Sequence, residues 1–69
     1  MEKFVCKQDC ELGYFNDKVE KGQEFPVLRN IKNECVLIRA ELNEPNIIVE
    51  AKQLRKYGTL SGTPQLGGS

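Results

Sequence analysis

The chain has 69 residues, of which 39% are hydrophobic and 29% carry a charge. A chain of this length buries only about 60% of the surface that it exposes when unfolded, which indicates one domain and excludes a large enzyme fold. Ten basic and ten acidic residues give a net charge of zero, so no overall field attracts the protein to nucleic acid or to an anionic membrane.

The residue types restrict the function further. Histidine, the usual general base near neutral pH, is absent, which removes most triad chemistry. Lys7 and Asp9 interrupt the start of the chain before it forms the apolar run of a secretory signal, and no stretch approaches the length of a transmembrane helix. Three cysteines, an odd number, are typical of free thiols in a reducing compartment. We therefore expect a cytoplasmic protein without a membrane partner.

The beginning of the chain has the alternating pattern of a strand with one buried face. Within residues 3–7, Phe4 and Cys6 share one side of this strand. Residues 8–18 show no comparable alternation, and we expect them to form a long loop.

A second strand is expected over residues 24–29, where Phe25 and Val27 share one face. Pro26 lies between them and cannot donate a hydrogen bond to a sheet ladder. This strand is therefore expected at a sheet edge or at a bend.

The clearest alternation covers residues 35–42. Residues 43–46, Asn-Glu-Pro-Asn, have turn chemistry, and the β-branched residues 47–49 predict the return strand of a hairpin. Residues 51–57 are good helix formers and are followed by Gly58, which predicts one short helical turn.

The end of the chain differs in composition from the rest. The last twelve residues, from Gly58 onward, carry no charge and are rich in Gly, Ser, Thr and Pro. This composition is typical of a flexible tail. We therefore assign residues 1–60 to the folded domain and residues 61–69 to the tail.

Residues 17–28 have a distinctive order: an apolar residue, a charged pair and a glycine, then alternating apolar residues. This order resembles the diverging turn and following strand of SH3-like small barrels, of the type found in bacteria and their phages. Val19, Gly22, Phe25 and Val27 hold the corresponding places. The glycine of such a turn adopts a conformation that is costly for other residues.

The resemblance implies an all-β fold, a small five-stranded SH3-like barrel with the short helical turn before its last strand. Such barrels include peptide binders, nucleic-acid binders and viral accessory proteins. The chain has no tryptophan, and it has Cys35-Val36 and residues 50–54 where eukaryotic SH3 domains carry a tryptophan and a Pro-Ser-Asn-Tyr-like segment. The aromatic groove that docks polyproline is therefore not expected.

Cys6, Cys10 and Cys35 supply only three ligands to a structural zinc site, which needs four. A disulfide between Cys6 and Cys10 is sterically allowed but is not expected in a reducing compartment. The carboxylates, lysines, tyrosines and thiols do not stand at a spacing that fixes a catalytic geometry. We expect no metal, no cofactor and no enzymatic activity.

Leu12, Tyr14 and Phe15 place three large apolar side chains in the expected loop. Aromatic residues on a surface often carry binding energy, so these residues are candidate anchors for a protein partner, with Tyr57 as an outlying one. In the alternative, one ring folds back over the small core as a lid. We expect one of Tyr14 and Phe15 inside and the other outside.

A basic cluster is the second candidate site. It would form if the third strand lies beside the terminal helical turn, and it consists of Arg39, Lys52, Arg55 and Lys56, with Tyr57 as a stacking ring. Residues 35–57 nevertheless carry four basic and three acidic groups, a net charge of only +1. This balance favours a mixed, solvated surface.

The leading hypothesis is a non-enzymatic protein-binding module. The resemblance implies more specifically a phage or mobile-element accessory protein that docks on a host protein. The alternatives are a nucleic-acid-binding small barrel and a protein that associates with itself through the edge of an open barrel.

Overall fold

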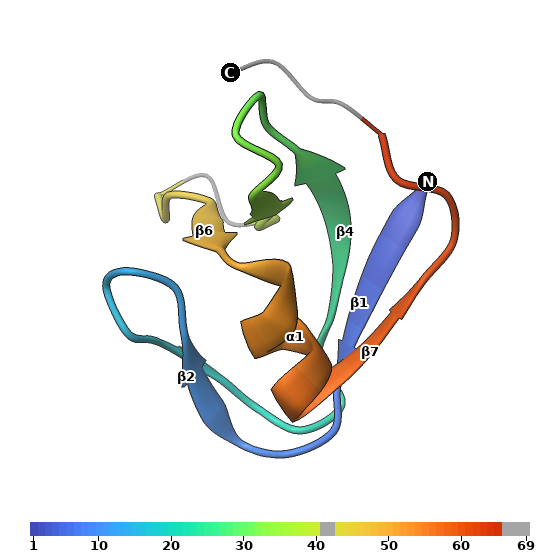
Figure 1. The fold of residues 1–69 in the computed structure, drawn as a ribbon. Coiled ribbons are helices and arrows are strands. Elements are labelled where there is room, and N and C mark those ends of the chain that lie inside the picture. The colour runs from blue at the N-terminus through green and yellow to red at the C-terminus, as the bar shows by residue number, and fades with distance from the viewer. Residues whose placement is uncertain (41–42, 66–69) are drawn as a thin grey trace.

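The computed structural model of the protein describes residues 1–40 and 43–65. In this part of the chain there are seven short strands and one helix (Figure 1): β1 Glu2–Cys6, β2 Cys10–Leu12, β3 Asp17–Val19, β4 Glu24–Arg29, β5 Cys35–Leu37, β6 Ile47–Val49, α1 Ala51–Tyr57 and β7 Gly58–Ser61. None of the described helical residues form a segment long and apolar enough to cross a membrane.

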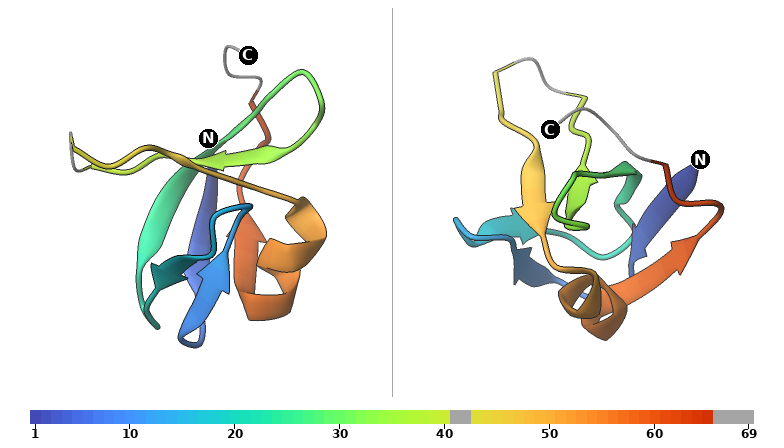
Figure 2. Two further views of the ribbon diagram at one scale, coloured as in Figure 1. Left: turned by 90° about the vertical axis from the view of Figure 1, so that its left-hand side faces the viewer. Right: turned by 45° about the horizontal axis from the view of Figure 1, so that its top comes forward.

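The strands form two antiparallel sheets. Five of them lie in the order β6-β5-β4-β1-β7, and β2 and β3 form a separate two-stranded hairpin. The protein is therefore mostly β with one short helix, as the sequence predicts, but the described strands do not close into a barrel. Figure 2 shows the twist of the larger sheet, with the hairpin and α1 beside it.

One hydrophobic core joins the larger sheet, the hairpin and the helix. Its fully buried side chains include Phe4 from β1, Leu12 from β2, Leu37 from β5 and Leu54 from α1. Phe4 and Cys6 are both buried, which confirms the predicted inward face of the first strand. The alternation of the strand thus turns one of its sides into the core.

β4 is a central strand that contains a proline. Phe25 and Val27 are buried as predicted, but β4 lies between β1 and β5, so the expected edge position is wrong. Ile38 N donates to the Pro26 carbonyl at 3.0 Å, and Pro26 has no N–H to donate back. Proline is tolerated because the ladder between β4 and β5 ends at this pair.

The hairpin of β5 and β6 is confirmed, with Val36 opposite Ile48. Instead of the expected strand over residues 35–42, β5 stops at Leu37, where Pro26 ends the ladder. Residues 41–42 lie outside the described residues.

The predicted helical turn is confirmed as α1, which ends at Tyr57, directly before Gly58. The backbone of this glycine is extended, with φ −171°, so no left-handed cap requires it. A Cβ on Gly58 would instead overlap the Val5 carbonyl oxygen. Glycine is therefore needed here because β7 approaches β1 closely.

The turn between the hairpin and β4 contains a glycine with a left-handed backbone. Gly22 has φ +92°, in the left-handed region, and its N–H donates to the Cys6 carbonyl at 2.9 Å. Val19, which precedes the turn, is buried. The turn thus fixes the start of β4 against the end of β1.

A buried ion pair joins β1 to β4. Arg29 Nε and Nη2 donate to the two carboxylate oxygens of Glu2 at 3.0 and 2.9 Å, and the two side chains are 10% and 5% exposed, respectively. The hydrogen bond to Glu2 raises the pKa of Arg29. This two-pronged geometry satisfies both charged groups inside the protein.

The first residues of the expected tail contact the same region. The Arg29 N–H donates to the Gln65 carbonyl at 2.7 Å, and Gly62 lies directly against the Met1 carbonyl. Gly62 and Gln65 therefore contact the domain, and β7 continues to Ser61. Residues 66–69 lie outside the described residues.

Candidate functional site: the tip of the β2–β3 hairpin

The exposed aromatic residues lie on a hairpin that the sequence pattern does not reveal. In place of the expected loop over residues 8–18, β2 pairs with β3, and Glu11 lies opposite Lys18. Each strand has only three residues, which is too short for an alternation to stand out. A usable signal was the spacing of Gly13 and Asn16, two residue types that tolerate a left-handed backbone.

The hairpin tip, residues 13–16, has a fixed backbone. Gly13 has φ +81° and Asn16 has φ +53°, and the Asn16 N–H donates to the Gly13 carbonyl at 3.4 Å. A Cβ on Gly13 would lie 2.8 Å from Ile47 Cγ2 and 2.9 Å from the Ile48 carbonyl oxygen. The backbone of the hairpin tip thus packs against β6 at a position that only glycine fits.

Tyr14 ties the hairpin tip to the connection between β4 and β5. Its hydroxyl donates to Glu34 Oε2, and Glu34 Oε1 accepts a hydrogen bond from Asn30 Nδ2 at 3.0 Å. The bond to the carboxylate raises the pKa of Tyr14, and the bonds from Tyr14 and then Asn30 lower the pKa of Glu34. Asn30 Oδ1 also accepts the N–H groups of Lys32 and Glu34, so this connection is ordered around one buried amide.

Both aromatic rings of the hairpin tip are exposed, Tyr14 by 61% and Phe15 by 87%. The prediction that one ring is inside and the other outside is therefore wrong. Leu12 occupies the inward position of the hairpin and is fully buried. It belongs to the core and is not a surface anchor, which corrects the expectation that it contacts a partner.

Tyr57 lies away from the hairpin tip, at the end of α1. Its carbonyl accepts the Lys7 N–H at 2.9 Å, and its side chain packs against the core. The Lys56 ammonium lies 5.4 Å from the centre of its ring, within the range of a cation–π contact. The structure therefore does not join Tyr57 to Tyr14 and Phe15 in one surface.

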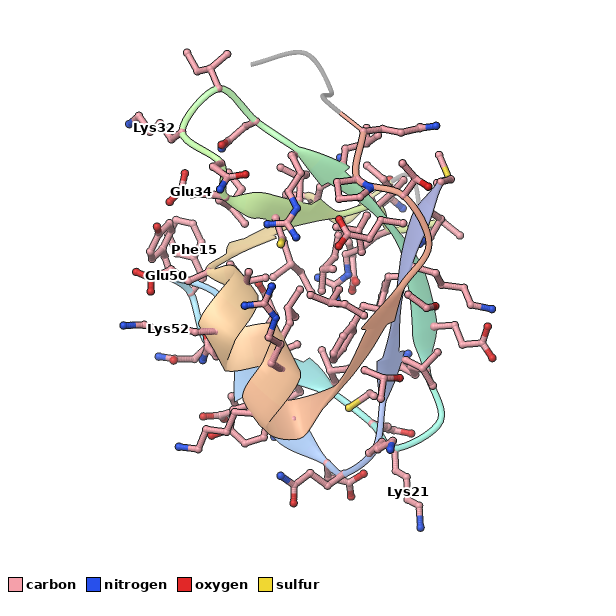
Figure 3. The ribbon with its side chains drawn as sticks, turned by 45° about the vertical axis from the view of Figure 1, so that its right-hand side comes forward. Phe15, Lys21, Lys32, Glu34, Glu50 and Lys52 are labelled. Atoms are coloured by element: carbon pink, nitrogen blue, oxygen red, sulfur yellow. The ribbon has the colours of Figure 1, made fainter. Side chains whose placement is uncertain are left out.

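In the view of Figure 3, charged side chains of both signs lie along the same side of the molecule as Phe15. Figure 3 shows Glu34 and Glu50 on either side of it, with Lys32 and Lys52 farther out along the same side of the molecule. Lys52 Nζ lies 3.6 Å from a carboxylate oxygen of Glu50. An apolar centre inside a polar rim is the arrangement that protein interfaces have.

Glu34 and Ile31 are not among the sequence-based candidates. Glu34 positions the Tyr14 ring, and Ile31 is 82% exposed in the same β4–β5 connection. No sequence pattern relates residue 34 to residue 14, because the packing of the hairpin tip on β6 brings them together.

Among the four basic residues of the alternative site, Arg39 forms ion pairs, and the other three lie on α1. Arg39, whose side chain is 16% exposed, lies 3.6 Å from Asp17 Oδ1 and 3.0 Å from Glu44 Oε2. Two carboxylates therefore neutralise its charge. The sheet neighbours of β5 are β4 and β6, whereas α1 carries the other three basic residues, Lys52, Arg55 and Lys56.

A pocket of about 390 Å³ opens on the stem of the hairpin, and it is lined by Asp9, Cys10, Glu11, Lys18, Val19 and Glu20. The Sγ atoms of Cys10 and Cys6 are 3.7 Å apart, and both thiols are free. Burial raises the pKa of Cys10 to about 11. Across residues 1–40 and 43–65, no three potential metal-ligating side chains are grouped around one point.

Of the sequence-based candidates, the structure brings Tyr14 and Phe15 together, both exposed, on one hydrogen-bonded turn. Comparison of the chain with models of protein families, with curated proteins and with solved structures gives no match. The function therefore has to be inferred from the protein's own residues.

Proposed function

We propose that the protein is a non-enzymatic module that binds another protein through its hairpin tip, with Phe15 as the main anchor. The observation that carries this proposal is the 87% exposure of Phe15 on a fixed turn. Burial of a phenyl ring contributes roughly 1.5–3 kcal/mol, and the described part of the fold does not gain this energy. A partner with an apolar pocket would gain it on binding.

The rigidity of the hairpin tip supports a role in recognition. Gly13 fixes its backbone against β6, and the hydrogen bond from Tyr14 to Glu34 fixes its other side. A flexible loop would lose roughly 0.5–1.5 kcal/mol for each side chain ordered on binding. A turn that is ordered beforehand avoids most of this loss.

The charges favour a partner that differs from this chain. A second copy presents, within its described residues, the hairpin pocket, whose lining includes Asp9, Glu11, Lys18 and Glu20. A phenyl ring placed there would desolvate charged groups without pairing them. The fitting partner is instead a protein with an apolar pocket and a polar rim that complements Glu34 and Glu50.

The proposal extends to the fold family and the biological role. The left-handed Gly22, the hairpin of β5 and β6, and the short helix before β7 support an open form of the SH3-like small barrel. We further propose that the protein is of the bacterial and phage type of this family, and that it is an accessory protein that docks on a host protein in the cytoplasm.

Photo-crosslinking tests the hairpin tip directly. A photoreactive phenylalanine analogue at position 15 is expected to crosslink one protein in a candidate bacterial host. The same analogue at position 21 is the control, because Lys21 is exposed and lies at the other end of the molecule (Figure 3). Capture of the same proteins from both positions would contradict the proposal.

The affinity for the identified partner gives the quantitative test. Phe15→Ser is expected to weaken binding at least about tenfold while leaving the thermal midpoint of the free protein unchanged within about 2 °C, because an exposed ring adds little to folding. Unchanged affinity would contradict the proposal. A steep fall of affinity with salt and nucleic acid in the complex would instead support the basic residues of α1.

A further inference from the structure

We propose that Cys6 and Cys10 are a redox-active thiol pair that forms a reversible disulfide between the five-stranded sheet and the β2–β3 hairpin. Cys6 ends β1, and Cys10 begins β2. Their Sγ atoms are 3.7 Å apart. This proposal does not depend on the proposed binding function.

The turn between the two cysteines holds the thiols together. The Cys6 thiol donates to the Gln8 carbonyl at 2.8 Å, inside this turn, and Cys10 Sγ is its other neighbour. A disulfide has an S–S bond of about 2 Å, so the two sulfurs must approach by less than about 2 Å. Rotation of the partly exposed Cys10 side chain supplies a movement of this size.

The pocket on the hairpin stem assigns different roles to the two thiols. Cys10 lines this pocket and is reached from solvent, whereas Cys6 is only 2% exposed. A small oxidant therefore meets Cys10 first, and Cys6 acts as the resolving thiol. Cys35 is fully buried in β5, so an oxidant in solution does not reach its thiol, and it is the unreactive member of the three.

A low-molecular-weight disulfide such as glutathione disulfide is the oxidant. The Cys10 thiolate attacks one sulfur of glutathione disulfide, which forms a mixed disulfide and releases one glutathione thiolate. The Cys6 sulfur, after losing its proton to water, then attacks the Cys10 sulfur and releases the second glutathione thiolate. Two protein thiols are oxidised, one glutathione disulfide is reduced, and the two thiol protons end on two glutathione molecules.

The surroundings of Cys10 make this reaction slow at neutral pH. Burial first, then Cys6 and Asp9, raise the pKa of Cys10 to about 11. The other charged residues that line the pocket, Glu11, Lys18 and Glu20, are of both signs. Only the thiolate attacks. The rate is therefore expected to rise about tenfold for each pH unit between pH 7 and pH 10.

A tryptic map of the oxidised wild-type protein tests the pairing. The reduced protein is treated with glutathione disulfide at pH 8, blocked with N-ethylmaleimide and digested with trypsin, which cleaves after Lys7 and so separates the two cysteines. The expected product is residues 4–7 joined to residues 8–18, which come apart when a reductant is added. A lasting glutathione adduct on Cys10, or a link to Cys35, would overturn the proposal.

Two variants provide the matched controls. Cys35→Ala keeps the pair and is expected to give the same linked peptides, whereas Cys10→Ser is expected to give none. Oxidation is expected to raise the thermal midpoint of the wild-type protein by several degrees, because a disulfide lowers the conformational entropy of the unfolded state. The thermal midpoint of Cys10→Ser is expected to stay unchanged. Linked peptides found only in a disulfide-bonded dimer would contradict an intramolecular pair.

Discussion

Apolar side chains are usually buried and charged ones exposed, and both the Glu2–Arg29 ion pair and the hairpin tip depart from this distribution. Only the ion pair finds its interaction partners within the described part of the protein. The ion pair buries two charges, and both oxygens of Glu2 accept hydrogen bonds from one guanidinium. The hairpin tip exposes Phe15, and no described residue covers its ring. The fold itself pairs the two buried charges, which is a structural role, whereas the exposed ring is the basis of the proposed partner binding.

Breaking the ion pair is expected to have the largest effect on stability. Arg29→Met leaves the Glu2 carboxylate buried without its partner, which costs about 3–5 kcal/mol. The free energy of unfolding, measured in urea, is expected to fall by this amount. Replacing both residues with methionine is expected to recover most of the loss, because no unpaired charge then remains inside.

An exposed ion pair between the same two strands is the control for this prediction. Lys3 Nζ lies 2.7 Å from Glu24 Oε1, and both side chains are about half exposed. Lys3→Met is expected to change the free energy of unfolding by less than about 1 kcal/mol. Equal losses for Lys3→Met and Arg29→Met would show that burial does not distinguish the two pairs.

The packing of the hairpin tip on β6 is tested by two glycines that share a left-handed backbone. Gly13→Ala adds both backbone strain and a clash with Ile47, so it is expected to lower the free energy of unfolding by about 2–3 kcal/mol. Gly22→Ala adds only the strain, since no heavy atom lies within 4 Å of the added Cβ, and is expected to cost about 1 kcal/mol. Equal losses in urea unfolding would mean that the hairpin tip does not contact β6 as described.

The parts of the fold that follow from local pattern were predictable from the sequence. Phe4 and Cys6 face the core because alternation over five residues fixes the inward side of a strand. The hairpin of β5 and β6 and the following helix are marked by turn residues and by Gly58. These signals lie within a few residues of the elements that they specify.

The remaining features depend on contacts between distant residues. Glu2 and Arg29 are 27 positions apart, and the central place of β4, in spite of Pro26, depends on the order of the sheet. At the candidate site, the sequence pointed to Tyr14 and Phe15. It also pointed to the buried Leu12, because strands of three residues give too short a pattern to identify the inward position.

The smallest expected effect is that of the Tyr14 hydroxyl on the rigidity of the hairpin tip. Tyr14→Phe keeps the ring and removes its hydrogen bond to Glu34. Because both groups are exposed, water replaces part of this bond, and a small decrease of the thermal midpoint is expected. The pH dependence of this decrease identifies the bond, since its stronger, charge-assisted form requires an ionised Glu34 and a protonated Tyr14.

The direction at each end of the pH range follows from the two pKa shifts. The pKa of Glu34 is lower in the folded protein than its ordinary value of 4.5, so the contribution is present above that value and is lost as the pH falls through the folded pKa. The pKa of Tyr14 is higher than its ordinary value of 10.0, so the contribution is complete below pH 10.0 and is lost above it. The difference in midpoint between the wild-type protein and Tyr14→Phe should thus be constant between pH 4.5 and pH 10.0 and should decrease at both ends. An undiminished difference in acid, where Glu34 is protonated, would show that the hydroxyl holds the hairpin tip through some other group.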